Sequence, residues 1–245
     1  MEMMLVLLLG IAAGTVGGIV GFGTSIMLMP ALVWVFGPYE AVPIMAVGSV
    51  MANATRVAVW WRELDWPAVR AYAVGAVPGA ALGAWTLVQL HAGLIEALLG
   101  AFFLVMIGLR RWMARRHWRI RAPHLAAAGL GIGFLTGLVV STGPINAPFF
   151  LAYGLTRGAY IGTEALASLV VYLTKTVTFG QLGALPLHLL VKGAIIGCSL
   201  IGGSLLSRRV VLRMTPGRFD RWMDGLLAVA GITMLAGAWR AAHGG

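Results

Sequence analysis

The chain has 245 residues and a net charge of +10; 60% of its residues are hydrophobic and 11% are charged. Because soluble domains are about 45–50% apolar and about 25% charged, this composition excludes a water-soluble enzyme and a disordered tail. The single cysteine, Cys198, excludes a disulfide scaffold, so the sequence predicts an all-α integral membrane protein.

Five apolar segments follow one another in the first half of the chain. They cover residues 3–20, 24–36, 42–61, 66–90 and 93–112. A helix that crosses the hydrocarbon core needs about 20 apolar residues, and all segments but the second approach or reach that length. We treat the first segment as structure and not as a signal peptide, because it lacks a basic stretch before it and a clear cleavage site after it.

The second segment is too short to cross the membrane and begins at a helix breaker. Its length is roughly 20 Å at 1.5 Å per residue. The breaker and the residues after it include Gly21, Gly23, Thr24 and Ser25. A helix that begins inside the membrane presents unpaired N–H groups and a positive dipole end, which suit an anion. The alternative is a tight hairpin in which Thr24 and Ser25 only cap the helix.

Arg56 is a basic residue inside an apolar segment. It lies near the end of segment 42–61, and Asn53 precedes it by one helical turn. Ionisable side chains within membrane segments are rare and commonly mark a substrate pathway. Two interpretations stay open: Arg56 and Asn53 bind a substrate anion, or the long side chain of Arg56 reaches the membrane interface.

A basic stretch separates the two halves. Six of the 18 Lys and Arg residues lie between Arg110 and Arg121, and five more lie between Arg208 and Arg221. Short loops rich in Lys and Arg stay in the cytoplasm, so both stretches should lie on that side, beside anionic lipid head groups. Such local clusters do not form a nucleic-acid-binding face, and no nucleic-acid partner is expected. The sequence divides into a first transmembrane repeat, 1–112, a basic cytoplasmic linker, 113–123, and a second transmembrane repeat, 124–245.

The second half again contains five apolar segments, and again the second one is short. The segments cover residues 124–140, 145–155, 159–180, 187–206 and 222–240. The breaker and the start of the short segment hold Ser141, Thr142, Gly143 and Asn146. A second half-helix N-terminus with hydroxyl and amide donors is therefore predicted, and the hairpin alternative applies here too.

One acidic and one basic residue lie within segment 159–180. Lys175, like Arg56, lies about one and a half turns inside the end of its segment, and the same two interpretations apply. Glu164 lies near the start, where it either relays protons or is a solvated residue at a helix end. The histidines are scattered without metal-binding spacing, so neither a metal nor a cofactor is expected.

The two halves resemble each other when the sequence is shifted by 119 residues, without a gap over residues 10–84. The pairs include Gly14 with Gly133, Ser49 with Ser168, Thr55 with Thr174, Arg56 with Lys175, Pro67 with Pro186 and Gly83 with Gly202. Chance agreement in a glycine-rich chain is the alternative. Each half has five segments, an odd number, and both basic loops should lie in the cytoplasm. The second half therefore has the opposite orientation in the membrane to the first. The prediction is two inverted-topology repeats with 8–10 membrane segments and a substrate site near the midplane.

A glycine series recurs in both halves. It comprises Gly14-x-x-x-Gly18-x-x-Gly21-x-Gly23, Gly75-x-x-x-Gly79-x-x-x-Gly83, and Gly133-x-x-x-Gly137 followed by Ser141-Thr142-Gly143. This pattern, together with the length and the two-half layout, resembles the TauE/SafE sulfite exporters (TSUP). The resemblance implies movement of a small sulfur-containing anion, such as sulfite, thiosulfate or an organosulfonate, across the inner membrane.

We therefore expect a multi-pass secondary transporter of the cell inner membrane that works by alternating access. The anion would contact the two breakers, Asn53, Asn146, Arg56 and Lys175, with Glu164 as a proton-coupling residue. An anion channel and a membrane assembly subunit remain alternatives. No enzyme is expected, since no nucleophile with a base lies in the apolar segments. The expected partners are the anion and membrane lipids, and a homodimer is left open.

Overall fold

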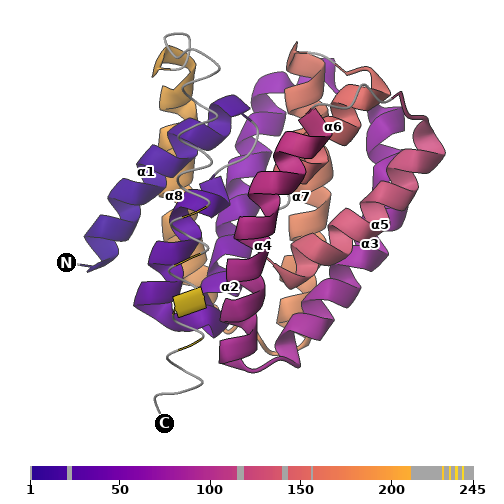
Figure 1. The fold of residues 1–245 in the computed structure, drawn as a ribbon. Helices are drawn as coiled ribbons and strands as arrows, with labels where there is room; N and C mark the ends of the chain where they lie inside the picture. Colours follow the sequence, from indigo (N-terminus) through magenta and orange to yellow (C-terminus); the bar gives the residue numbers. More distant parts are fainter. Residues whose placement is uncertain are drawn as a thin grey trace.

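The computed structural model describes residues 2–20, 24–114, 119–139, 143–155, 157–210 and five positions between 228 and 239, and none of these residues forms a strand. The predicted last segment, 222–240, lies largely outside them, as do residues 115–118 of the predicted 113–123 linker. The helices, labelled in Figure 1, are α1 (Glu2–Val20), α2 (Thr24–Trp60), α3 (Trp66–Val88), α4 (Ala92–Ala114), α5 (Ala122–Leu138), α6 (Gly143–Tyr153), α7 (Arg157–Gln181) and α8 (Leu187–Val210), with a 3₁₀ turn at Trp61–Glu63.

The predicted segments 24–36 and 42–61 form a single element, α2, which is broken at Gly37. The backbone there has φ 76° and ψ 163°, a conformation that glycine adopts without a steric penalty. The part of α2 before Gly37 is therefore a short helix, as is α6 with its 11 residues. Neither is long enough to cross the hydrocarbon core, which confirms that the second segment of each half is short.

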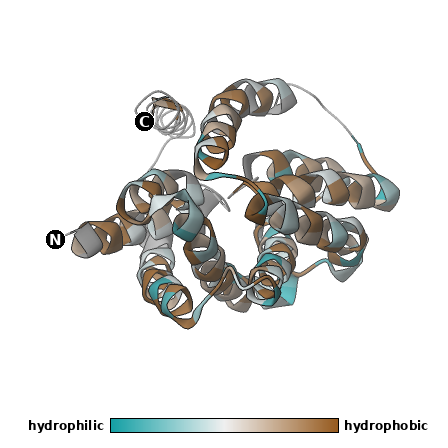
Figure 2. Cartoon of the chain, turned by 90° about the horizontal axis from the view of Figure 1, so that it is seen from below, coloured by the Kyte–Doolittle hydropathy of each residue, from teal (hydrophilic) through white to brown (hydrophobic). Residues whose placement is uncertain are grey.

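Several helices are long and apolar enough to cross a membrane. Among the described residues, four candidate spans are Met27–Glu63, Trp66–Val88, Ala92–Leu109 and Leu187–Leu205. Large apolar side chains such as Val74, Leu82 and Leu187 point outward and are exposed. Brown, apolar residues likewise dominate the helices in Figure 2. The expectation of an all-α membrane protein is confirmed.

Glycines bring two pairs of helices into close contact. In the pair α3 and α5, a Cβ on Gly75, Gly79 or Gly83 would collide with backbone atoms of α5. In the pair α1 and α8, a Cβ on Gly14 would collide with the backbone of Leu200, and one on Gly203 with that of α1. Close backbone approach increases van der Waals contact, which is the main attraction between helices in lipid.

Helix α7 runs through the bundle between α2 and α3 and links two distinct ends (Figure 1). We call the end that holds the turn 61–65 and the first residues of α5 and α7 the basic end. The opposite end, with the turns 89–91 and 182–186, is the neutral end. Helices α3 and α5 both begin at the basic end, where Asp65 Oδ1 accepts the Ala68 N–H (2.8 Å) and caps α3.

Candidate functional site

An ion pair is buried where α2 crosses α7. Arg56 Nη1 lies 3.0 Å from Glu164 Oε2, and the two side chains are 10% and 1% exposed. The interpretation of Glu164 as a solvated residue at a helix end is therefore wrong, because α2 and the bundle interior cover its carboxylate. The alternative in which Arg56 reaches the membrane interface is wrong for the same reason: its guanidinium turns inward to Glu164.

Three amide and hydroxyl side chains complete this cluster. Asn53 Oδ1 accepts a hydrogen bond from Arg56 Nη2. On the other side, Ser168 Oγ donates to Glu164 Oε1 (2.7 Å), and Asn146 Nδ2 lies 3.4 Å from the same oxygen. The cluster, Asn53, Arg56, Asn146, Glu164 and Ser168, thus joins α2, α6 and α7.

Burying the two charged groups of this cluster carries a free-energy cost. Removing two charges from water costs several kcal/mol per ion, and the attraction between them offsets this only when further hydrogen bonds satisfy both groups. Asn146 Oδ1 nevertheless accepts no hydrogen bond among the described residues, although it is buried. An ionisable pair buried inside a membrane protein is, by default, a hypothesis of a functional site.

Lys175 lies in a second buried site, at the C-terminal end of α5. Its ammonium group donates to Thr136 O (2.8 Å) and Val139 O (2.6 Å), and Nζ lies 5.5 Å from the centre of the Phe179 ring. Because the last carbonyls of a helix carry partial negative charge, a cation is stabilised there. Lys175 is 1% exposed, so its ammonium group does not reach the membrane interface either.

The two predicted cations are not in one cluster. Lys175 follows Glu164 by three helical turns on α7, about 16 Å at 1.5 Å per residue. Their contact partners flank the α5–α6 breaker in the sequence: Lys175 binds the end of α5, before the breaker, and Glu164 is next to Asn146 in the first turn of α6, after it. The second breaker therefore has one buried charge site on each side.

The remaining predicted site residues belong to the breakers themselves. Gly21, Gly23, Ser141 and Thr142 lie outside the described residues. Thr24 begins α2 and its hydroxyl lies against Gly17 of α1, and Ser25 is buried. Gly143 begins α6, as the half-helix prediction requires.

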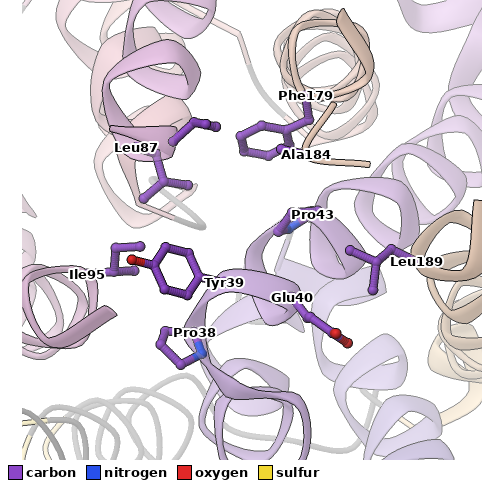
Figure 3. Close-up of a pocket in the computed structure, with 10 residues that line it drawn as sticks. Pro38, Tyr39, Glu40, Pro43, Leu87, Ile95, Phe179, Ala184 and Leu189 are labelled. Carbon is purple, nitrogen blue, oxygen red and sulfur yellow. The ribbon is translucent and has the colours of Figure 1, made fainter. Parts of the chain in front are cut away.

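A hollow of about 220 Å³ opens at the neutral end (Figure 3). It is lined by Pro38, Tyr39, Glu40, Pro43, Leu87, Val88, Ile95, Phe179, Ala184 and Leu189. Tyr39 Oη donates to Leu90 O (3.0 Å), and the Glu40 carboxylate pairs with Lys192 Nζ (2.8 Å). The walls are therefore mostly apolar, and the charges lie at the rim.

Three residues with clear contacts were not predicted from the sequence. Ser168 could have been found, because it follows Glu164 by four positions and so lies on the same face of the helix. Tyr72 packs its ring against Phe150 (5.3 Å between centres) next to the cluster, and no sequence pattern indicates this. Phe179 next to Lys175 is likewise visible only in the structure.

No group of three or more His, Cys, Asp or Glu residues able to hold a metal occurs in the part of the chain that the structure describes.

A family model described as Sulfite exporter TauE/SafE matches residues 6–234, nearly the whole chain. The chain belongs to the sulfite exporter TauE/SafE family. The resemblance drawn from the glycine series is thereby confirmed, and membership makes the protein a multi-pass membrane protein of a family of anion exporters. Both buried charge sites of this TauE/SafE protein lie within the matched region. Comparison with curated proteins and with solved structures finds no match.

Proposed function

We propose that this TauE/SafE protein is a secondary transporter of a small sulfur-containing anion, such as sulfite, thiosulfate or an organosulfonate. The observation that carries the proposal is that Arg56 is buried and has a carboxylate of the protein itself as its counter-ion. Sulfite and sulfonate oxygens are acceptors for a guanidinium, as carboxylate oxygens are. The transported anion therefore binds by replacing Glu164 on Arg56.

The helix N-termini at the breakers supply the other ligands in this proposal. Asn146 stands in the first turn of α6 and already touches the carboxylate that the anion replaces. Backbone N–H groups at the start of α6, next to Asn146, suit an anion, and in this proposal those at the start of α2 join them. The neutral donors are those of the predicted set, Gly21, Gly23, Thr24, Ser25, Asn53, Ser141, Thr142, Gly143 and Asn146.

Lys175 provides a second positive charge further along the path. It lies three helical turns after Glu164, the partner of Arg56, on α7, which runs from the basic end to the neutral end. An anion that crosses the membrane passes Lys175 and Arg56 in turn. Two positively charged sites along the path favour entry of the anion from either end, and neither site alone has to bind it very tightly.

Glu164 couples transport to protons in this proposal. The Arg56–Glu164 pair is electrically neutral as it stands, and a monovalent anion that binds together with one proton leaves that balance unchanged. Protonation of Glu164 removes the competing negative charge and releases Arg56 to the anion. A proton gradient can then drive the anion uphill, which an anion channel cannot do.

In this proposal the two alternating states of the transporter arise from a pair of inverted repeats. Under the 119-residue shift, α1 corresponds to α5 and α8 to α3. The observed close pair α1 and α8 thus corresponds to the observed close pair α5 and α3. This correspondence supports two halves that pack alike and rock against each other around a shared site.

The test is anion binding by purified protein, followed by uptake into proteoliposomes. Thermal shifts against sulfite, thiosulfate, sulfate, sulfoacetate, taurine and chloride identify the ligand class. The double variant Arg56→Gln/Glu164→Gln keeps the cluster neutral and should weaken sulfite binding about tenfold or more, because the desolvated charge contact is lost. Arg70→Gln, at an exposed arginine of α3, is the matched control and should bind like the wild type. Equal binding by the double variant would contradict the role of Arg56, and uptake that never exceeds equilibrium under a proton gradient would identify a channel.

A further inference from the structure

The hollow at the neutral end has a counterpart at the basic end. The 119-residue shift pairs Phe179 with Trp60, and it pairs two other lining residues, Tyr39 and Pro43, with Gly158 and Gly162. All three pairs fall within residues 10–84 of the first half, where the shift runs without a gap. The two ends of the α2–α7 contact can therefore be compared position by position.

The counterpart at the basic end is tightly closed. A Cβ on Gly158 would collide with the Trp60 ring and the Glu63 carboxylate, and one on Gly162 would collide with Trp60. In addition, the Asp65 N–H donates to Thr163 Oγ1 (2.9 Å), which ties the turn 61–65 to α7. We call this contact of Trp60 with Gly158 and Gly162 the basic-end seam.

The same positions at the neutral end enclose open space. Phe179 lies across the hollow from Tyr39, as Figure 3 shows, and the Tyr39 side chain is held aside by its hydrogen bond to Leu90 O. Because a water molecule takes up about 30 Å³, a space of this size admits a small anion with part of its hydration shell. Phe179 lines the hollow, and its ring also lies next to Lys175, whose ammonium is 5.5 Å from the ring centre.

We propose that the hollow is the open mouth of the transport path and that Phe179 is its gate residue, the counterpart of Trp60. The structure is then the state that is open at the neutral end and closed at the basic-end seam. In the opposite state Phe179 packs against Pro43 and Tyr39, while Trp60 leaves Gly158 and Gly162. The inference rests on the proposed transport function, but it concerns how the two ends move and not which anion binds.

The experiment measures the reactivity of single cysteines at the two ends. In a Cys198→Ser background, Ala184→Cys reports on the hollow and Ala159→Cys, next to Gly158, reports on the basic-end seam. A membrane-impermeant methanethiosulfonate reagent is added to purified full-length protein, without any anion. The thiol from Ala184→Cys should react at least about tenfold faster than that from Ala159→Cys, since one state dominates.

Removing Trp60 then tests whether the two ends alternate. Trp60→Ala should speed the reaction of Ala159→Cys and slow that of Ala184→Cys, each by about tenfold, because destabilising one closed end populates the other. Adding Phe179→Ala should restore the reactivity of Ala184→Cys, since the gate side chain is then missing. Trp61→Ala is the matched control: Trp61 is the exposed neighbour of Trp60 and should change neither rate. If Trp60→Ala does not fold, Trp60→Phe should shift both rates in the same directions by a smaller factor.

The outcomes separate this inference from the proposed function. If loss of Trp60 speeds only Ala159→Cys and leaves Ala184→Cys unchanged, the seam loosens locally, the ends do not alternate, and the gate assignment is overturned. Opposite changes at the two ends support it even if sulfite fails to bind, in which case the anion assignment alone is wrong. If Phe179→Ala leaves Ala184→Cys slow in the Trp60→Ala background, another side chain closes the mouth and Phe179 is not the gate.

Discussion

Glu164 occupies the position on Arg56 that an anion would take. Its carboxylate receives the guanidinium on one oxygen and the Ser168 hydroxyl on the other, so the buried charges are balanced without any ligand. In a low-dielectric interior an unbalanced charge would be far more costly. In the proposed mechanism a substrate anion therefore meets a competitor inside the protein, the Glu164 carboxylate.

Glu164→Gln should bind thiosulfate more tightly than the wild type. The amide of Gln cannot compete for Arg56 as an anion, so we expect about tenfold tighter binding at pH 8. Isothermal titration of the variant and the wild type under the same conditions measures the difference. Glu63→Gln, at an exposed carboxylate in the turn 61–65, is the control, and equal binding by Glu164→Gln and the wild type would exclude competition by Glu164.

Lys175 and Lys192 are the two lysines of the chain and form a natural comparison. Lys175 is buried against the carbonyls of α5, whereas Lys192 is part-exposed at the rim of the hollow. Lys175→Met should lower sulfite uptake into proteoliposomes by about tenfold, since a desolvated charge on the path is lost, while Lys192→Met should have a much smaller effect. Equal uptake by Lys175→Met and the wild type would remove Lys175 from the path.

At the scale of the elements, the contact between α3 and α5 depends on glycines that face a backbone. A Cβ on Gly133 would collide with Ala76 O and Cα, whereas one on Gly131, on the same helix, meets nothing within 4 Å. Gly133→Ala should therefore destabilise the protein by about 1–3 kcal/mol through overpacking. Gly131→Ala should be neutral or stabilise it by up to about 1 kcal/mol, because alanine favours helix. Thermal melting in detergent of the two variants checks the opposite signs, and a similar shift for both would contradict the close α3–α5 contact.

Helix ends could be read from the sequence, whereas contacts between distant helices could not. Runs of apolar residues bounded by Gly21–Gly23, Gly143 and Pro67 placed most helix ends correctly, since glycine and proline interrupt helices for local steric reasons. Arg56 and Lys175 stood out because a charge in an apolar run is rare. The partner of Arg56, however, is 108 residues away, and only packing of α2 on α7 brings Glu164 to it. For the same reason the sequence placed Arg56 and Lys175 in one site, while in the fold they lie in two separate buried sites.

Across the whole molecule, charge is distributed unevenly between the two ends. The basic end carries Arg62, Arg119 and Arg121, whereas the turns 89–91 and 182–186 carry no Lys, Arg, Asp or Glu. Lys and Arg in short loops are retained in the cytoplasm during insertion. The neutral end, with the hollow and the Phe179 gate, should therefore face the outside of the cell, and the basic-end seam should face the cytoplasm.

Labelling of intact cells tests this orientation. In the Cys198→Ser background, Gln89→Cys at the neutral end should react with a membrane-impermeant maleimide added outside, because its side chain is exposed in the turn beyond α3. Arg119→Cys at the basic end, also exposed, should react only after the membrane is permeabilised. Loss of one arginine leaves most of the basic cluster in place, so the substitution itself should not invert the protein. Labelling of Arg119→Cys in intact cells would place the hollow in the cytoplasm, and an anion entering through the Phe179 gate would then be leaving the cell.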